Sequence, residues 1–224
     1  MVLNAKQTKC LPFISSETKD FMPELRIKTE DSLEVIWELK LVGLIVTSDL
    51  TWHAHVEYTV GRVSKILWQL TRFKRLGASQ DKLITFYVLK IRSILMFGSV
   101  CFHSSISSEL SQRLELQQKR CFAIILGSQY GSYHNAATLL DLPRLDTLRS
   151  EACLKWANKA AANPQHTHLF PHSQSKIDTR HKQKYKEYFC HSAKYYNSAV
   201  PHMTRLLNKQ PSAITTNSGV IIPI

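Results

Sequence analysis

The spacing of apolar residues changes near residue 50, and this change constrains the fold of the chain more than any other sequence feature. Before it, segments such as "SLEVIWELK" (32–40) alternate apolar and polar residues, as a half-buried strand does. From Trp52 onward, apolar residues recur every three or four positions, as on one face of an α-helix. The sequence therefore predicts a mainly α (α+β) fold, in which a small N-terminal antiparallel sheet precedes a helical bundle.

Three segments are expected to form the strands: "ELRIKT" (24–29), "SLEVIWELK" and "LKLVGLIV" (39–46). The last is the most uniformly apolar, so we expect it to be the most buried strand of the sheet. Gly43 lies inside it, and a glycine within a strand marks a bulge or a place where another backbone comes close.

The helices are predicted from their apolar stripes and their stop signals. The first runs from Trp52 to about Leu76 before Gly77, the second starts near Ser79, and the third ends at Gly127. A short helix is expected at "NAATLLDL" (135–142), and a fifth at 144–162. The expected core positions are Val56, Val60, Val63, Leu67 and Leu70 in the first helix, Leu83, Tyr87, Ile91, Ile94 and Leu95 in the second, Leu110, Leu114, Cys121 and Ile125 in the third, and Leu145, Leu148, Ala152 and Trp156 in the fifth.

This pattern divides the chain into three expected parts: strands over 1–50, a helical bundle over 51–165 and a basic tail over 166–224. The periodicity fades after about residue 171, where the chain holds 8 Lys and Arg against 2 Asp and Glu. We expect this tail to be weakly ordered, with one partial helix near 182–196.

Charge is distributed unevenly along the chain. The first 50 residues hold 6 Lys and Arg against 8 Asp and Glu, whereas the remainder holds 23 against 9. A basic helical region of this kind indicates a polyanionic partner, because neutralising phosphates releases counterions. Away from the apolar stripe, the first helix carries Arg62, Lys65, Arg72, Lys74 and Arg75, and the second adds Lys82, Lys90 and Arg92.

Two interpretations of this basic face remain open from the sequence: a nucleic-acid-binding surface and an ordinary solvated helix face. Phe73 and Trp68 could stack on bases or sugars, although Trp68 could equally belong to the core.

No catalytic, metal or cofactor site is predicted. The sequence has no P-loop, dinucleotide fingerprint or Gly-x-Ser-x-Gly elbow, and no acidic pair is placed to hold catalytic metal ions. His53 and His55 are two positions apart and so point to different faces of a helix, and the string His166, His168 and His172 has no carboxylate or cysteine at ligand spacing.

We expect the protein to be intracellular, in the nucleus or the cytoplasm. The five cysteines are scattered without a Cys-x-x-Cys pair, and the N-terminus lacks the apolar core of a secretory signal. No run approaches the ~18 uninterrupted apolar residues of a membrane span, so no membrane partner is expected.

The order of these motifs resembles the end of the reverse transcriptase of non-LTR (LINE-type) retrotransposons. The resemblance begins at "LNAKQTK" (3–9), continues through "KLVGL" (40–44), Asp49, Leu50, Trp52 and His55, and includes "RVSKILWQLTRFKRLGAS" (62–79). It extends to "LLDLPRLDTLRSEACLKWANKAAANP" (139–164), "HLFP" (168–171) and "NSAVPHMTRLLNK" (197–209). In this family the strand that residues 40–44 match is the primer grip, and the turn after it leads into the helical thumb.

The resemblance implies primer contact near Leu41, Val42 and Gly43, and a thumb helix that closes over the minor groove of an RNA or DNA duplex. Lys6 or Lys9 would match the late lysine of the palm. The fingers, most of the palm and the Tyr-x-Asp-Asp carboxylates would precede the chain, so no polymerase activity of its own is expected. Its missing partner would be the palm and fingers of a parent polymerase.

Two other interpretations accompany this one. The chain could be a vestigial or protein-interaction fragment whose charges only keep a small bundle soluble. Residues 25–75 also look similar to the N-terminal domain of an AlkB-type tRNA-modifying dioxygenase. The His-x-Asp…His iron triad of that enzyme class is absent from the sequence, so no dioxygenase activity is expected.

Overall fold

The structure is a computed structural model that describes residues 8–13, 26–27, 31–173 and 184–210. It is mostly helical, with a small antiparallel sheet near the N-terminus, which confirms the predicted fold class. The chain divides into two compact units, and this division differs from the three parts expected from the sequence. Unit 1 comprises Met1–Leu95 and Ile106–Ile124, and unit 2 comprises Met96–Ser105 and Ile125–Ile224.

Among the described residues of unit 1, the strands form three separate pairs. In the first, β1 (Lys9–Cys10) runs parallel to β4 (Glu34–Val35). The antiparallel pairs are β2 (Arg26–Ile27) with β3 (Asp31–Ser32), and β5 (Glu38–Leu41) with β6 (Leu44–Thr47). Most of the strand expected at 24–29 lies outside the described residues.

The segment 39–46 was expected to be one buried strand, and this prediction is wrong. The chain reverses there: β5 and β6 form a hairpin in which Leu41 pairs with Leu44. The two residues of the turn, Val42 and Gly43, have φ values of 48° and 89°. Positive φ at both positions is what a type I′ hairpin turn requires. Gly43 is therefore a turn glycine rather than a bulge, and the uniform apolarity of the segment concealed the turn.

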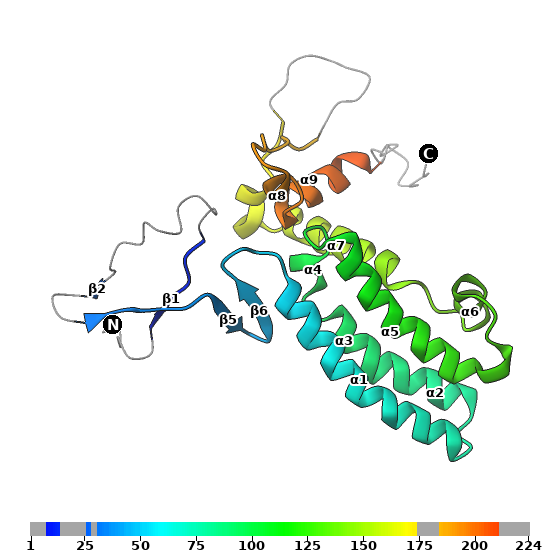
Figure 1. Ribbon diagram of the computed structural model, residues 1–224. Coiled ribbons are helices and arrows are strands. Elements are labelled where there is room, and N and C mark those ends of the chain that lie inside the picture. Colours follow the sequence, from blue (N-terminus) through cyan, green and yellow to red (C-terminus); the bar gives the residue numbers. More distant parts are fainter. Residues whose placement is uncertain (1–7, 14–25, 28–30, 174–183, 211–224) are drawn as a thin grey trace, which may run out of the picture. The chain divides into compact units, whose positions relative to one another are not determined.

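The helices of unit 1 confirm the predicted periodicity. They are α1 (His53–Arg75), a continuous run of α2 (Gln80–Phe86), π-helical η3 (Tyr87–Arg92) and α3 (Ser93–Met96), and α5 (Ser108–Leu126). Figure 1 shows these helices lying alongside one another. Their buried side chains include Val56, Val63, Leu70, Leu83, Ile91 and Leu114. The Tyr87 ring meets Phe122 edge-to-face at 5.7 Å between centroids, which ties η3 to α5.

One segment, Gln80–Phe102, is long and apolar enough by length and composition to cross a membrane. The sequence predicted no run of ~18 uninterrupted apolar residues, and Asp81, Lys82, Lys90 and Arg92 do interrupt this segment. Mostly buried core helices of globular proteins meet the same criterion; here Leu83 and Ile91 are buried, and 28% of the apolar window of the segment is buried.

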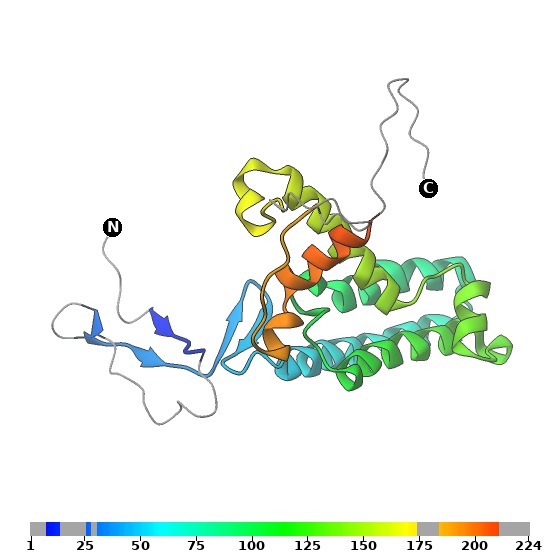
Figure 2. The same cartoon turned by 90° about the horizontal axis from the view of Figure 1, so that it is seen from above.

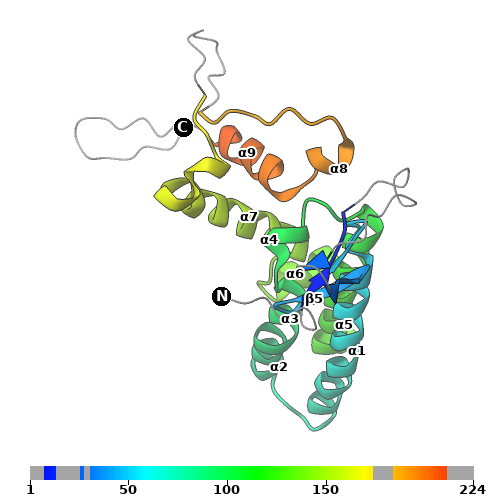
Figure 3. The same ribbon diagram turned by 90° about the vertical axis from the view of Figure 1, so that its left-hand side faces the viewer.

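Unit 2 contains α4 (Ser99–Phe102), η4 (Gly127–Gln129), α6 (Tyr133–Leu139), α7 (Leu145–Ala162), η5 (Pro164–Leu169), α8 (Ala193–Tyr196) and α9 (Ala199–Lys209). The views in Figures 1 and 3 agree that α9 lies along α7. A single apolar core joins the two helices: Cys153, Ala157, Ala160, Phe170, Tyr185, Met203 and Leu207.

This core corrects two expectations from the sequence. Within the expected tail, Tyr185 and residues of α9 are packed in the core with α7. Of the partial helix expected at 182–196, only α8 is helical among the described residues, and α9 follows it. Residues 174–183 and 211–224 lie outside the described part of the chain. The buried stripe of α7 runs through Leu145, Arg149, Cys153, Ala157 and Ala160 rather than through Ala152 and Trp156. Trp156 remains 38% exposed, and its ring meets Phe170 edge-to-face at 6.4 Å between centroids.

The turn residue Val42 generates a stability prediction. It is 86% exposed and its backbone is left-handed, a conformation that costs a β-branched residue roughly 1–2 kcal/mol. We expect Val42→Asn, which gives the Asn-Gly pair favoured in type I′ turns, to raise the free energy of unfolding of unit 1 by about 1 kcal/mol in urea titrations.

The matched control is Val35→Asn. Val35 is also an exposed valine, but its φ is not positive. Asparagine is depleted in strands, so this change should be neutral or destabilising. Equal effects of the two substitutions would contradict the assignment of strain to the turn.

Candidate functional site

A tight connection joins the hairpin to the first helix, and it uses the residues of the Asp49-to-His55 motif. The backbone turns through Leu50 and Trp52, which have φ values of 53° and 62°. The Asp49 carboxylate accepts hydrogen bonds from the Thr47 hydroxyl at 2.6 Å and from the Thr51 N–H at 3.2 Å. Side chains of this length commonly close turns in this way.

His55 fastens α1 to the hairpin across this connection. Its Nδ1 accepts a hydrogen bond from the Ile45 N–H of β6 at 3.4 Å, and its ring meets Trp52 edge-to-face at 6.1 Å. Burial lowers the pKa of His55, which favours the neutral ring that this acceptor role requires. His55 is buried whereas His53 is exposed, so the two histidines do not act together. Figure 2 shows the hairpin at the N-terminal end of α1.

Lys40 extends this connection onto the outer surface of α1. Its Nζ donates a hydrogen bond to the Tyr58 hydroxyl at 2.9 Å and lies 4.5 Å from the centre of the ring. Arg62 lies one turn further along, with its guanidinium carbon 5.7 Å from the same ring. The hydrogen bond from Lys40 lowers the pKa of Tyr58, outweighing the smaller effect of desolvation. The tyrosine therefore accepts from one cation and lies beside a second.

The remaining basic residues of α1 face solvent, as the sequence predicted. Arg62, Lys65, Arg72, Lys74 and Arg75 are all exposed. The only acidic residue of α1 is Glu57, which pairs with Arg113 of α5. The helix therefore presents five basic side chains, and its one carboxylate is engaged elsewhere.

Trp68 belongs to this outer surface, and its alternative assignment to the core is wrong. The side chain is 62% exposed, and the Arg72 guanidinium carbon lies 5.3 Å from its ring. Phe73 instead packs edge-to-face against Phe86 at 5.1 Å and is 42% exposed. Because residues three and four apart share a helix face, five of these α1 residues lie on one ridge, and Lys40 of β5 joins it through Tyr58; the six are here named the basic strip. They are Lys40, Tyr58, Arg62, Lys65, Trp68 and Arg72.

The three expected primer-grip residues lie at the free end of the hairpin. Leu41 and Val42 are 56% and 86% exposed, and Gly43 completes the turn. The expected glycine-interrupted strand is therefore an exposed apolar hairpin tip, next in sequence to Lys40 of the basic strip. Lys74 and Arg75 lie in the last turn of α1, about 32–33 Å of helix from its first residue. Of the two candidate palm lysines, Lys9 pairs with Glu34 at 3.0 Å, and Lys6 lies outside the described residues.

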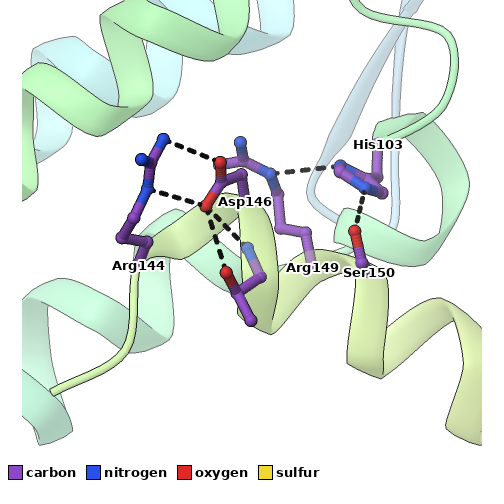
Figure 4. Close-up of polar contacts among 6 residues, drawn as sticks. His103, Arg144, Asp146, Arg149 and Ser150 are labelled. Atoms are coloured by element: carbon purple, nitrogen blue, oxygen red, sulfur yellow. Dashed lines mark hydrogen bonds and ion pairs between the residues drawn. The ribbon is translucent and has the colours of Figure 1, made fainter.

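Unit 2 contains a polar cluster that sequence analysis did not find, shown in Figure 4. Arg149 is fully buried, and its Nε donates to Nδ1 of His103 at 3.3 Å. The other ring nitrogen of His103, Nε2, lies 2.9 Å from the Ser150 hydroxyl. Nearby, Arg144 donates to Asp146 at 3.2 and 2.8 Å, and the Thr147 N–H donates to the same carboxylate at 2.8 Å.

The geometry of this cluster excludes a Ser–His hydrolase arrangement. Burial, followed by the charge of Arg149, lowers the pKa of His103 from 6.5 to about 4, so the ring is neutral. Since Nδ1 accepts from Arg149, the single proton lies on Nε2, which donates to Ser150. A general base for Ser150 would need that nitrogen unprotonated. The cluster therefore binds α7 to the chain around His103 and does not activate a nucleophile.

The other histidines form no metal centre in the described part of the chain. His166 and His168 are exposed, and His172 stacks on Tyr185 at 5.2 Å. Among the residues that the structure describes, no group of three or more His, Cys, Asp or Glu side chains could hold a metal ion.

Comparisons with models of known protein families, with curated proteins and with solved structures found no match.

The polar cluster of unit 2 predicts a pH dependence of stability. His103 has a lower pKa in the folded chain than in the unfolded chain, so below about pH 6.5 only the unfolded chain takes up this proton. Stability should therefore fall as the pH drops from 6.5 to about 4. We expect His103→Gln to lose less stability than the wild type between about pH 7 and about pH 4.5 in urea titrations.

The control is His134→Asn, which changes an exposed histidine of α6. It should retain the full acid sensitivity. Burial also lowers the pKa of His202, so a residual dependence should remain in both variants. If the stability of His103→Gln fell with pH as steeply as that of the wild type, His103 would titrate alike in the folded and unfolded chains.

Proposed function

We propose that this chain is a remnant of an RNA-directed DNA polymerase of the non-LTR retrotransposon type, without polymerase activity of its own. Its retained property would be non-specific binding of nucleic-acid duplexes through the hairpin tip and α1 of unit 1. This proposal combines the ordered motifs of the sequence with the position of their residues on one hairpin and one helix.

The observation that carries the proposal is the outward face of α1. Arg62, Lys65 and Arg72 lie on one ridge with Tyr58 and Trp68, and no carboxylate of the helix shares it. The ridge from Tyr58 to Arg72 is about 21 Å long, which matches about six base-pair steps of a duplex. Exposed cations over this length suit contact with successive phosphates and carry no sequence preference.

The hairpin tip supplies contacts of a different kind. Leu41 and Val42 are exposed and apolar, and the turn at Gly43 brings the backbone to the surface. Such a tip can pack against sugars and base edges while the basic strip contacts the phosphates. Lys40 lies between the two, held by Tyr58. Duplex binding through this surface would be weak and salt-sensitive, because it depends mainly on phosphate charge.

A second candidate function is a protein-interaction fragment. The observation that favours it is the exposure of Trp37, Leu41 and Val42 on and beside the hairpin, since exposed apolar groups of this size mark contact surfaces. In the proposed parent polymerase, the partner at this surface would be the palm. The two functions differ in their dependence on the basic residues of α1.

The first prediction concerns those basic residues. Lys65→Ala/Arg72→Ala/Arg75→Ala should bind a short blunt DNA duplex about tenfold or more weakly than wild type in fluorescence anisotropy. The slope of log affinity against log salt should become shallower by up to about three, one for each lost phosphate contact.

The matched control is Lys155→Ala/Lys159→Ala/Lys186→Ala, which removes three exposed positive charges from unit 2. Both triple variants lower the net charge equally, so a non-specific effect of charge would weaken both alike. If the α1 variant bound the duplex as tightly as wild type, the proposed interface would be refuted. The solvated-surface interpretation would then stand.

The second prediction concerns catalysis. In the proposed parent family, metal-dependent synthesis needs acidic side chains that converge on divalent cations, and the sequence provides no such pair. The full chain should therefore add no nucleotide to a primer on an RNA template with magnesium and deoxynucleotides. Incorporation above a no-protein control would contradict the proposal, provided that a heat-treated sample of the same preparation is inactive.

A further inference from the structure

We propose that Trp68 and Arg72 form a stacking site for an unpaired nucleobase, so that the basic strip prefers a duplex that continues into a single strand. This inference rests on the proposed function and names its substrate class. It concerns Trp68 because this is the large apolar side chain of the basic strip that is not packed in the core of unit 1.

The exposure of Trp68 is the first observation. Its indole ring is 62% exposed on α1, while Val63 and Leu70 of the same helix are fully buried. The ring therefore contributes little to the core of unit 1. Covering such a ring removes a large apolar area from water, which favours association with a flat, apolar ligand surface.

Arg72 places a positive charge beside the Trp68 ring, where it can attract an anion. Its guanidinium carbon lies 5.3 Å from the Trp68 ring, one helical turn further along α1. An arginine held in this way keeps a positive charge beside an aromatic surface, as sites for single-stranded nucleic acids do. Lys65 is exposed about one turn before Trp68. Along the axis, Lys65 and Arg72 are about 10 Å apart, so cations bracket the ring on both sides.

This bracketing identifies the ligand chemistry. A flat aromatic group linked on both sides to phosphates would stack on the ring while its phosphates contact Lys65 and Arg72. Nucleotides have this alternation of base and phosphate, and stacking tolerates every base because each has a π face. In a continuous duplex each base face is already covered by its neighbours, so Trp68 is expected to stack on a base only beyond the paired region.

The test compares two DNA ligands on the full-length chain by fluorescence anisotropy: a short blunt duplex and the same duplex with an unpaired 3′ extension. We expect wild type to bind the extended duplex about tenfold more tightly, within the range measured for base–aromatic stacking. Trp68→Leu should bind the two ligands with equal affinity, whereas Trp68→Tyr should keep most of the preference. Abasic residues in the extension should also abolish it, because they retain the phosphates and lack the base.

The matched control is Trp37→Leu, which removes another half-exposed tryptophan of unit 1 outside the basic strip and should keep the preference. A preference that persists in Trp68→Leu, or that abasic residues leave unchanged, overturns the inference. Equal wild-type affinity for both ligands overturns it while the proposed duplex binding stands. Binding of the extended ligand through Trp68 without any binding of the blunt duplex supports the stacking site and refutes the proposed duplex function.

Discussion

The hydrogen bond from the Ile45 N–H to Nδ1 of His55 is the contact on which the proposed surface depends. It joins the second strand of the hairpin to the first turn of α1 across a connection with two left-handed residues, Leu50 and Trp52. With the hairpin held in this way, Lys40 of the other strand reaches Tyr58 and begins the basic strip. Burial lowers the pKa of His55 and so favours the neutral ring, and a protonated ring could not accept this bond.

Helical periodicity made much of unit 1 predictable from the sequence. The stripe through Val56, Val63 and Leu70 is buried as expected, and Gly77, with a φ of 80°, follows the end of α1. A stripe of this kind also determines which residues face outward, so the exposure of Arg62, Lys65 and Arg72 was foreseen. It could not place Trp68, because a tryptophan is common both in cores and on surfaces.

The errors have identifiable physical causes. The hairpin was missed because "LKLVGLIV" is apolar on both sides of the turn, and Val42 is an unfavourable residue at a position with positive φ. The buried stripe of α7 was misplaced because it contains Arg149, which donates a hydrogen bond to His103, 46 residues away in the chain. The core role of Met203 and Leu207 was missed because their burial depends on α7, which is distant in sequence. Periodicity within one segment contains no information about such partners.

The two units have different kinds of polar chemistry. In unit 2, His103 is hydrogen-bonded to both Arg149 and Ser150 inside the fold, and the tautomer of His103 leaves Ser150 without a base. In unit 1, the basic side chains of α1 face solvent, and the single carboxylate of that helix pairs with Arg113. Charge that is paired internally stabilises a fold, whereas charge left at the surface remains available to a ligand. This contrast places the proposed interface in unit 1.

Photocrosslinking to a duplex that carries a single-stranded extension, followed by mapping of the attached peptides by mass spectrometry, tests the central claim most directly. The aromatic side chains Tyr58 and Trp68 lie on the basic strip, so crosslinks to the α1 peptide are predicted, and they should diminish as salt is raised. Crosslinks confined to unit 2, or a yield at α1 that does not change with salt, would contradict the claim that this helix is the nucleic-acid-binding surface of the chain.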